Sequence, residues 1–104
     1  INLQQVQMGP EGAKTVAAAL RTNFVRDIDV RSTVIRDEGD RALAEALKVN
    51  KTVAFINLDS VRMGPDGAKS VAASLQGNKV IQKTILSYNP ITDEGTEALA
   101  EALK

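Results

Sequence analysis

The sequence contains no cysteine and no histidine, and each absence excludes a class of chemistry. Without cysteine the chain has no disulfides, no thiolate nucleophile and no zinc site of the thiolate type. Without histidine it lacks the commonest general base of enzymes that work near neutral pH. A chain free of cysteine suits a reducing compartment, so we expect a cytoplasmic protein with no catalytic site, no metal and no cofactor.

Net charge and long apolar runs are also missing. The 13 basic and 13 acidic residues balance, so nothing in the overall charge draws the chain to nucleic acid or to an anionic membrane. Electrostatic recognition must therefore be local. No segment has the length of a membrane-spanning helix, and the N-terminus has no signal pattern. The chain begins at Ile1 and not at Met, from which we expect a piece of a longer protein.

Internal repetition is the strongest feature that is present. The 20 residues from Ile1 match the 20 residues from Ile56 at 14 positions, and four glycines recur at intervals of 27, 28 and 28 residues. These glycines are Gly12, Gly39, Gly67 and Gly95. A fixed period of this length is typical of solenoid proteins. We therefore expect one domain over residues 1–104, made of repeats at about 1–27, 28–55, 56–83 and 84–104.

The apolar period changes within each repeat. Ile28 and Val30 alternate with polar residues as in a half-buried strand, and the pattern then lengthens to helical spacing, as in Ala68, Val71 and Leu75. Four short parallel strands are expected, at 1–3, 28–30, 56–58 and from residue 84. Helices are expected near 10–22, 37–49, 65–77 and 93–104, the fourth with an inward stripe of Thr96, Leu99, Ala100 and Leu103.

The run Val53, Ile56, Leu58, Val61 and Met63, followed by Gly67-Ala68, resembles the leucine-rich repeat of ribonuclease inhibitor and related immune receptors. The resemblance covers nearly the whole chain and implies protein binding as the activity. Because strand–helix–strand crossovers are right-handed, the fold class we predict is an α/β, right-handed solenoid. Its parallel sheet would lie on the concave side and its helices on the convex side.

One position departs from this pattern. The asparagine whose side chain satisfies the loop backbone in the family occurs only as Asn89, while Val6, Thr33 and Val61 hold the equivalent positions. Threonine can replace part of its hydrogen bonding, but valine cannot. The loops at Val6 and Val61 must satisfy their backbone groups in another way.

Two segments resemble chemical sites only superficially. The stretch from Gly9 to Thr15 has the glycines, lysine and hydroxyl of a phosphate-binding loop, but alanine separates the second glycine from Lys14. The acidic pairs Asp37-Glu38 and Asp93-Glu94 could be imagined as metal ligands, but neighbours on a helix point about 100° apart. Both features are better explained as helix starts, where acidic side chains complement the helix dipole.

A binding surface is expected on the strand face. Its outward rows hold mostly small or polar side chains, among them Asn2, Asp29 and Asn57. Three apolar or aromatic side chains from adjacent repeats are the exceptions, and we predict that they anchor a partner: Phe55, Ile85 and Tyr88. The polar residues expected around these anchors are Arg31, Asp59 and Lys83. The alternative is that Phe55 packs between strands and Ile85 is an isolated exposed residue.

Three functions compete. The first is a non-catalytic protein-recognition module, with a protein partner of unknown identity. The second is a structural or engineered repeat array that self-associates as a homo-oligomer through uncapped terminal repeats, because an open strand edge can pair with another chain. The third, an enzyme or a GTPase activator, has no set of residues to support it.

Overall fold

The computed structural model of the protein describes residues 1–22 and 24–102. Within them the chain forms four helices and three strands. The helices are α1 (Pro10–Leu20), α2 (Arg36–Val49), α3 (Pro65–Gly77) and α4 (Thr92–Ala102), and the strands are β1 (Asp27–Asp29), β2 (Phe55–Asn57) and β3 (Lys83–Ile85). Asn23, which shares the repeat spacing of Asn50 and Asn78, lies outside the described residues. So do Leu103 and Lys104, the expected end of the fourth helix.

The three strands form one parallel sheet in the order β1-β2-β3, and Ile28, Ile56 and Thr84 are paired across it. The parallel arrangement is confirmed, but the expectation of four strands is wrong for the described residues. The first repeat contributes only an isolated bridge between Asn2 and Asp29. Each strand also begins one residue earlier than predicted, because the residue before the first apolar position already pairs with the next repeat.

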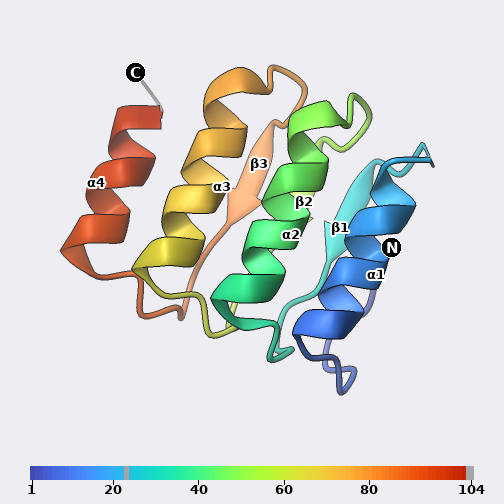
Figure 1. Cartoon of the computed structure of the whole chain (residues 1–104), viewed down its shortest axis with the longest axis horizontal. Coiled ribbons are helices and arrows are strands. Elements are labelled where there is room, and N and C mark those ends of the chain that lie inside the picture. Colours follow the sequence, from blue (N-terminus) through green and yellow to red (C-terminus); the bar gives the residue numbers. More distant parts are fainter. Residues whose placement is uncertain (23, 103–104) are drawn as a thin grey trace.

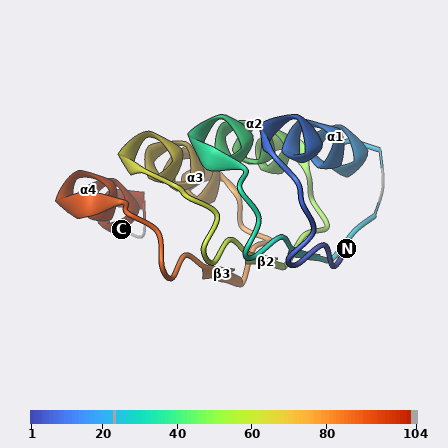
Figure 2. The ribbon, with the colours of Figure 1, turned by 90° about the horizontal axis from the view of Figure 1, so that it is seen from below.

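Helices and strands form two separate layers (Figures 1 and 2). Within the described part of the chain, contacts between helices join only helices that are neighbours in sequence, and contacts between strands join only strands that are neighbours in sequence. This nearest-neighbour pattern is the property of a repeat stack, in which one repeat supplies the apolar partner of the next. The molecule measures 32 × 28 × 18 Å.

The core lies between the two layers. The predicted inward strand residues Ile28, Val30, Ile56 and Leu58 are all at most 1% exposed. Of the helical stripe predicted in α3, Ala68 and Val71 are buried and Leu75 is half-buried. The corresponding positions of α1, namely Ala13, Val16, Ala17 and Leu20, are all buried. Met63 is fully buried, and the half-buried Met8 packs against the same core.

Helix starts follow the expected chemistry. Pro10 and Pro65 begin α1 and α3, where a missing N–H costs nothing, and Gly9 and Gly64 precede them in extended conformation. Asp37 and Glu38 lie in the first turn of α2 as predicted.

The predicted inward stripe of α4 is only partly correct. Leu99 is half-buried, but Thr96 and Ala100 are exposed. The equivalent residues of the preceding helices, Ala13, Asp40 and Ala68, are each buried against a glycine of the next helix. Among the described residues no helix follows α4, so this face stays open to solvent.

Candidate protein-binding surface

The sheet register brings two of the predicted residues together. Phe55 and Lys83 are direct partners across β2 and β3, and the Lys83 ammonium lies 5.9 Å from the centre of the Phe55 ring. This distance allows a cation–π contact. Phe55 is half-buried and Lys83 exposed, so the pair presents a partly covered aromatic ring beside a free charge.

Ile85 occupies the position that Asn2, Asp29 and Asn57 hold in the other repeats, and there this position has a structural role. The side-chain oxygens of Asn2, Asp29 and Asn57 each accept a main-chain N–H two residues later, at 3.2, 3.3 and 3.0 Å. Asn57 is only 4% exposed, so the expectation that this row is a solvated face is wrong there. Isoleucine cannot accept such a bond. Ile85 is half-buried and breaks the row with an apolar side chain.

The polar surround does not form one network. Arg31 lies 3.4 Å from the carboxylate of Asp29 in its own repeat, and Asp59 accepts a hydrogen bond from the hydroxyl of Ser60 at 3.1 Å. Arg31 and Asp59 are therefore each engaged locally, and no ion pair between them occurs among the described residues. A partner would have to compete with these contacts.

Tyr88 is the most accessible of the predicted anchors. Its side chain is 86% exposed, and its backbone adopts a left-handed conformation with φ of 57°. Gln5, Ser32 and Ser60 hold the same position and the same conformation in the other repeats. Small or polar residues satisfy this turn, so the fold itself does not require an aromatic ring here.

Three asparagines link successive repeats, and the repeat pattern predicted a role only for Asn89. The side-chain amides of Asn50 and Asn78 donate to the main-chain oxygens of Leu20 and Leu47, each at 2.9 Å, and so cap the preceding helix. Asn89 accepts the N–H groups of Val61 and Met63, each at 3.0 Å. The backbone of the loop at Val61 is thus satisfied from the next repeat. Regular spacing was the signal that could have revealed these caps.

The outer edge of β3 carries unused main-chain donors. Val30 and Leu58 donate their N–H groups to the next repeat, at Asn57 and Ile85. The equivalent N–H of Leu86 finds no main-chain acceptor among the described residues. Beside it lies a groove of about 350 Å³, whose apolar lining comes from Leu75, Ile81, Leu86 and Leu99.

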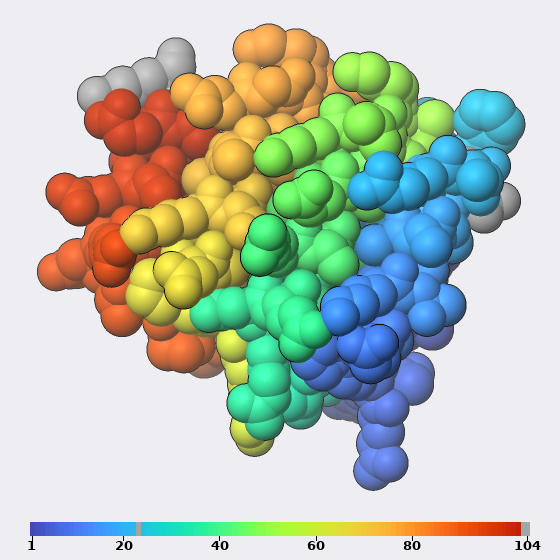
Figure 3. Space-filling model, in the orientation of Figure 1, coloured from blue at the N-terminus to red at the C-terminus, as the bar shows by residue number. Residues whose placement is uncertain are grey.

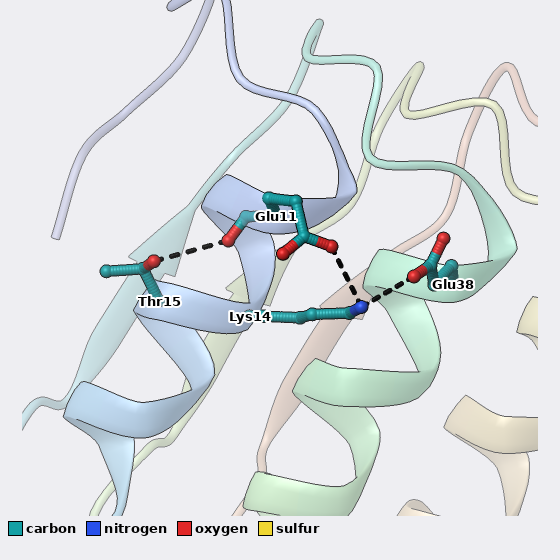
Figure 4. A network of polar contacts seen from close by, with 4 residues as sticks. All are labelled: Glu11, Lys14, Thr15 and Glu38. Atoms are coloured by element: carbon teal, nitrogen blue, oxygen red, sulfur yellow. Dashed lines mark hydrogen bonds and ion pairs between the residues drawn. The ribbon is translucent and has the colours of Figure 1, made fainter.

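Ion pairs tie the exposed faces of the helices together. Lys14 contacts Glu11 at 2.9 Å and reaches Glu38 of α2 at 2.6 Å (Figure 4). These hydrogen bonds raise the pKa of Lys14 to about 12, with Glu38 the larger contributor. Lys69 pairs with Glu94 in the same way between α3 and α4, and the pKa of Lys69 is raised by that bond.

Asp40 is the one described aspartate that is completely buried, and its two carboxylate oxygens have no hydrogen-bond partner in the described structure. Asp40 lies where α2 packs against Gly67 of α3, since a Cβ atom added to Gly67 would lie 3.0 Å from the Asp40 carboxylate. Alanine holds the equivalent place between α1 and α2, where a Cβ atom added to Gly39 would lie 2.9 Å from Ala13. Burial raises the pKa of Asp40 to about 8, and repulsion from Asp37 adds to the shift. Asp40 is therefore protonated at neutral pH.

Other kinds of site find no support in residues 1–22 and 24–102. No group of three or more acidic side chains is placed to hold a metal ion there. The same residues contain no helix with both the length and the apolar character needed to cross a membrane.

Known proteins share this arrangement. The profile of the family described as "Leucine Rich repeat" matches residues 85–100. NACHT, LRR and PYD domains-containing protein 14 of Mus musculus is 26% identical over 99% of this chain, and leucine-rich repeat-containing protein 73 of Rattus norvegicus is 31% identical over 86% of it. The chain spans 11% and 29% of the lengths of these two relatives.

A solved structure described as "Leiomodin-1 Actin-Binding Site 2 (ABS2)" superimposes with a TM-score of 0.89 at 22% identity, over 99% of this chain and 62% of that one. At this identity the likeness shows the fold alone. The chain is thus an α/β stack of parallel strand–helix repeats. Its repeats are leucine-rich repeats.

Proposed function

We propose that the chain is a cytoplasmic, non-catalytic protein-recognition module that binds its partner through the sheet face. In this proposal the stack is a right-handed solenoid of the ribonuclease-inhibitor-like type, with its sheet on the concave side. A recognition module needs exposed anchor residues that the fold does not need for itself. Tyr88 meets this condition, and it is the observation that carries the proposal.

Phe55, Lys83 and Ile85 extend the proposed site beside Tyr88. Phe55 and Lys83 face each other across β2 and β3, and Ile85 follows two residues after Lys83 on the same face of β3. Arg31 and Asp59 form the rim, where charged groups set orientation more than affinity. The site would therefore suit a protein segment with one apolar side chain and a nearby acidic group for Lys83.

A peptide display selection on the immobilised chain tests this proposal without knowledge of the partner. Tyr88→Ser is the sharpest variant because serine already occupies the position in two repeats, as Ser32 and Ser60. Thr15→Ala, on the exposed face of α1, is the control. Peptides selected on the parent should lose at least about tenfold in affinity for Tyr88→Ser and Phe55→Ala, as hot-spot residues do. Undiminished binding to both variants would contradict the proposal.

The alternative function is a repeat array that self-associates through its terminal repeats. The apolar groove at Leu75 and Leu99, together with the unused N–H of Leu86, favours this alternative. Burial of the groove by a second copy should make the chain's sedimentation depend on concentration, and Leu86→Lys should remove that dependence. A parent chain that remains monomeric at high concentration would eliminate the alternative.

A further inference from the structure

Charge is strongly segregated between the two edges of the repeat stack, although the net charge is zero. The segments that lead from helix to strand, 21–27, 48–55 and 76–83, contain six cations and a single acid, Asp27, which gives them a net charge of +5. We call these six cations the basic edge: Arg21, Arg26, Lys48, Lys51, Lys79 and Lys83. The three segments follow one another along the upper margin of Figures 1 and 3.

The cations of the basic edge are all exposed, and none of them has an ion-pair partner among the described residues. The cations that do form ion pairs lie elsewhere, namely Lys14, Arg31 and Lys69. Apart from the contact of Lys83 with the Phe55 ring, the basic edge therefore keeps its charge free for an external anion.

Helix dipoles do not explain this cluster. A cation stabilises a helix dipole only within the last turn, and Lys48 in α2 is the single basic residue so placed in the described helices. The carbonyl groups at the ends of α1 and α2 are capped instead by Asn50 and Asn78. Lys51, Lys79 and Arg26 lie beyond the helices, in loops, and their side chains form no ion pair in the described part of the chain.

The opposite edge, where the helices begin, is acidic, and several of its carboxylates form ion pairs or hydrogen bonds within the chain. Glu11 and Glu38 bind Lys14, Glu94 binds Lys69, and Asp37 accepts the N–H of Gly64. Glu45, Asp66, Asp93 and Glu97 are exposed acids without an ion pair among the described residues, but they lie on three different helices. A continuous acidic segment of an unrelated partner therefore matches the basic edge better than a second copy of this chain does.

An open groove of about 380 Å³ runs across this edge and touches the loops of three repeats. Phe24 and Arg26 come from the first loop, Lys51 and Thr52 from the second, and Val80 from the third. The side chain of Phe24 is 90% exposed. An exposed aromatic ring between cations offers an anchor for an apolar side chain flanked by acidic ones.

We propose that the basic edge binds an extended acidic segment of a partner protein, with Phe24 receiving one apolar residue of that segment. This surface shares only Lys83 with the proposed sheet-face site. The edge variant described below keeps Lys83, so the two proposed sites can be tested separately. Nucleic acid is a weaker candidate because basic nucleic-acid-binding domains have isoelectric points above about 9. The value for this chain is about 6.5.

Fluorescence anisotropy with a labelled glutamate-rich peptide that carries leucine at every fourth position tests the proposal. The edge variant combines Arg26→Gln, Lys51→Gln and Lys79→Gln. Its matched control combines Arg36→Gln, Arg41→Gln and Arg62→Gln, which removes the same charge from exposed positions elsewhere. Circular dichroism shows that both variants are folded before binding is compared.

The edge variant should bind the peptide about tenfold more weakly than the parent, whereas the control should differ by less than about twofold. In the parent, binding should also weaken when salt rises from about 50 mM to about 500 mM. The proposal would be overturned if the parent did not bind the peptide, or if the control variant lost as much affinity as the edge variant. It would also be overturned if single-stranded DNA or phosphatidylserine vesicles bound more tightly than the peptide, or if the parent were a dimer that the edge variant dissociates. Tyr88→Ser should leave binding of the acidic peptide unchanged. A failure of the basic-edge proposal can therefore be distinguished from a failure of the sheet-face proposal.

Discussion

The side-chain oxygen of Asn89 accepts the main-chain N–H of Val61 at 3.0 Å and so completes a loop that belongs to the preceding repeat. It accepts the N–H of Met63 at the same distance, while the amide group of Asn89 donates to the oxygen of Leu58 at 2.7 Å. One side chain thus satisfies three main-chain groups across a repeat boundary. Neighbouring repeats therefore depend on each other for hydrogen bonding as well as for apolar burial.

Asn89→Ala should lower the free energy of unfolding by about 1 to 3 kcal/mol, because it leaves the N–H groups of Val61 and Met63 without an acceptor. Urea unfolding followed by circular dichroism measures the change. Asn2→Ala is the control, since Asn2 is exposed and accepts a single N–H, that of Gln4 at 3.2 Å. Equal losses in the two variants would mean that the link between repeats contributes nothing.

Leu47→Ala should cost about 2 to 5 kcal/mol, because Leu47 is 1% exposed and its loss would leave a cavity in the core. Leu75 occupies the same position in the next repeat, but it is half-buried and lines the open groove. We therefore expect a clearly smaller loss for Leu75→Ala. Denaturant titration of both variants decides this, and a larger loss for Leu75→Ala would contradict the burial described here.

Asp40 should make the protein less stable as the pH rises. The Asp40 carboxyl keeps its proton in the folded state up to its pKa of about 8, whereas the unfolded chain releases it near the ordinary pKa of 3.8. Between these two values the folded state binds more protons, so the free energy of unfolding falls with increasing pH. Asp40→Ala should stabilise the chain by on the order of 5 kcal/mol at pH 8 and by much less at pH 4.

Unfolding of the parent and of Asp40→Ala at several pH values measures this difference. Alanine is the suitable replacement because Ala13 and Ala68 hold the equivalent position in two other repeats. Asp66→Ala removes an exposed carboxylate from the first turn of α3 and serves as the control. If the stability gain of Asp40→Ala were the same at pH 4 and pH 8, a charged Asp40 would not be the cause.

Sequence alone was sufficient for the approximate places of the helices and for the inward strand residues, because each depends on a local apolar period. Ile28 and Leu58 are buried as their alternation requires. The missing strand of the first repeat could not be foreseen, since Ile1 and Leu3 have the right pattern. In the structure this segment pairs with β1 only through the bridge between Asn2 and Asp29. The number of residues paired across a repeat boundary cannot be read from an apolar pattern within one repeat.

The candidate site was harder to predict, because alternation gives the direction of a side chain but not its contacts. Asn57 has the polarity of a surface residue and is buried, since its oxygen holds the N–H of Asp59. Asp40 resembles a surface acid on an amphipathic helix and lies inside a contact between helices. Phe24 was overlooked because its loop is one residue shorter than the equivalent loops, which hides its place in the repeat.

Hydrogen exchange of individual main-chain N–H groups, followed by NMR, is the most direct test of the parallel repeat stack on which both proposed surfaces depend. Val30 and Leu58 donate to the following repeat at 3.1 and 2.8 Å, so their N–H groups should exchange slowly. The N–H of Leu86, at the equivalent position on the open edge of β3, should exchange much faster. A Leu86 N–H as protected as that of Leu58, or a Leu58 N–H as labile as that of Leu86, would contradict the stack as described.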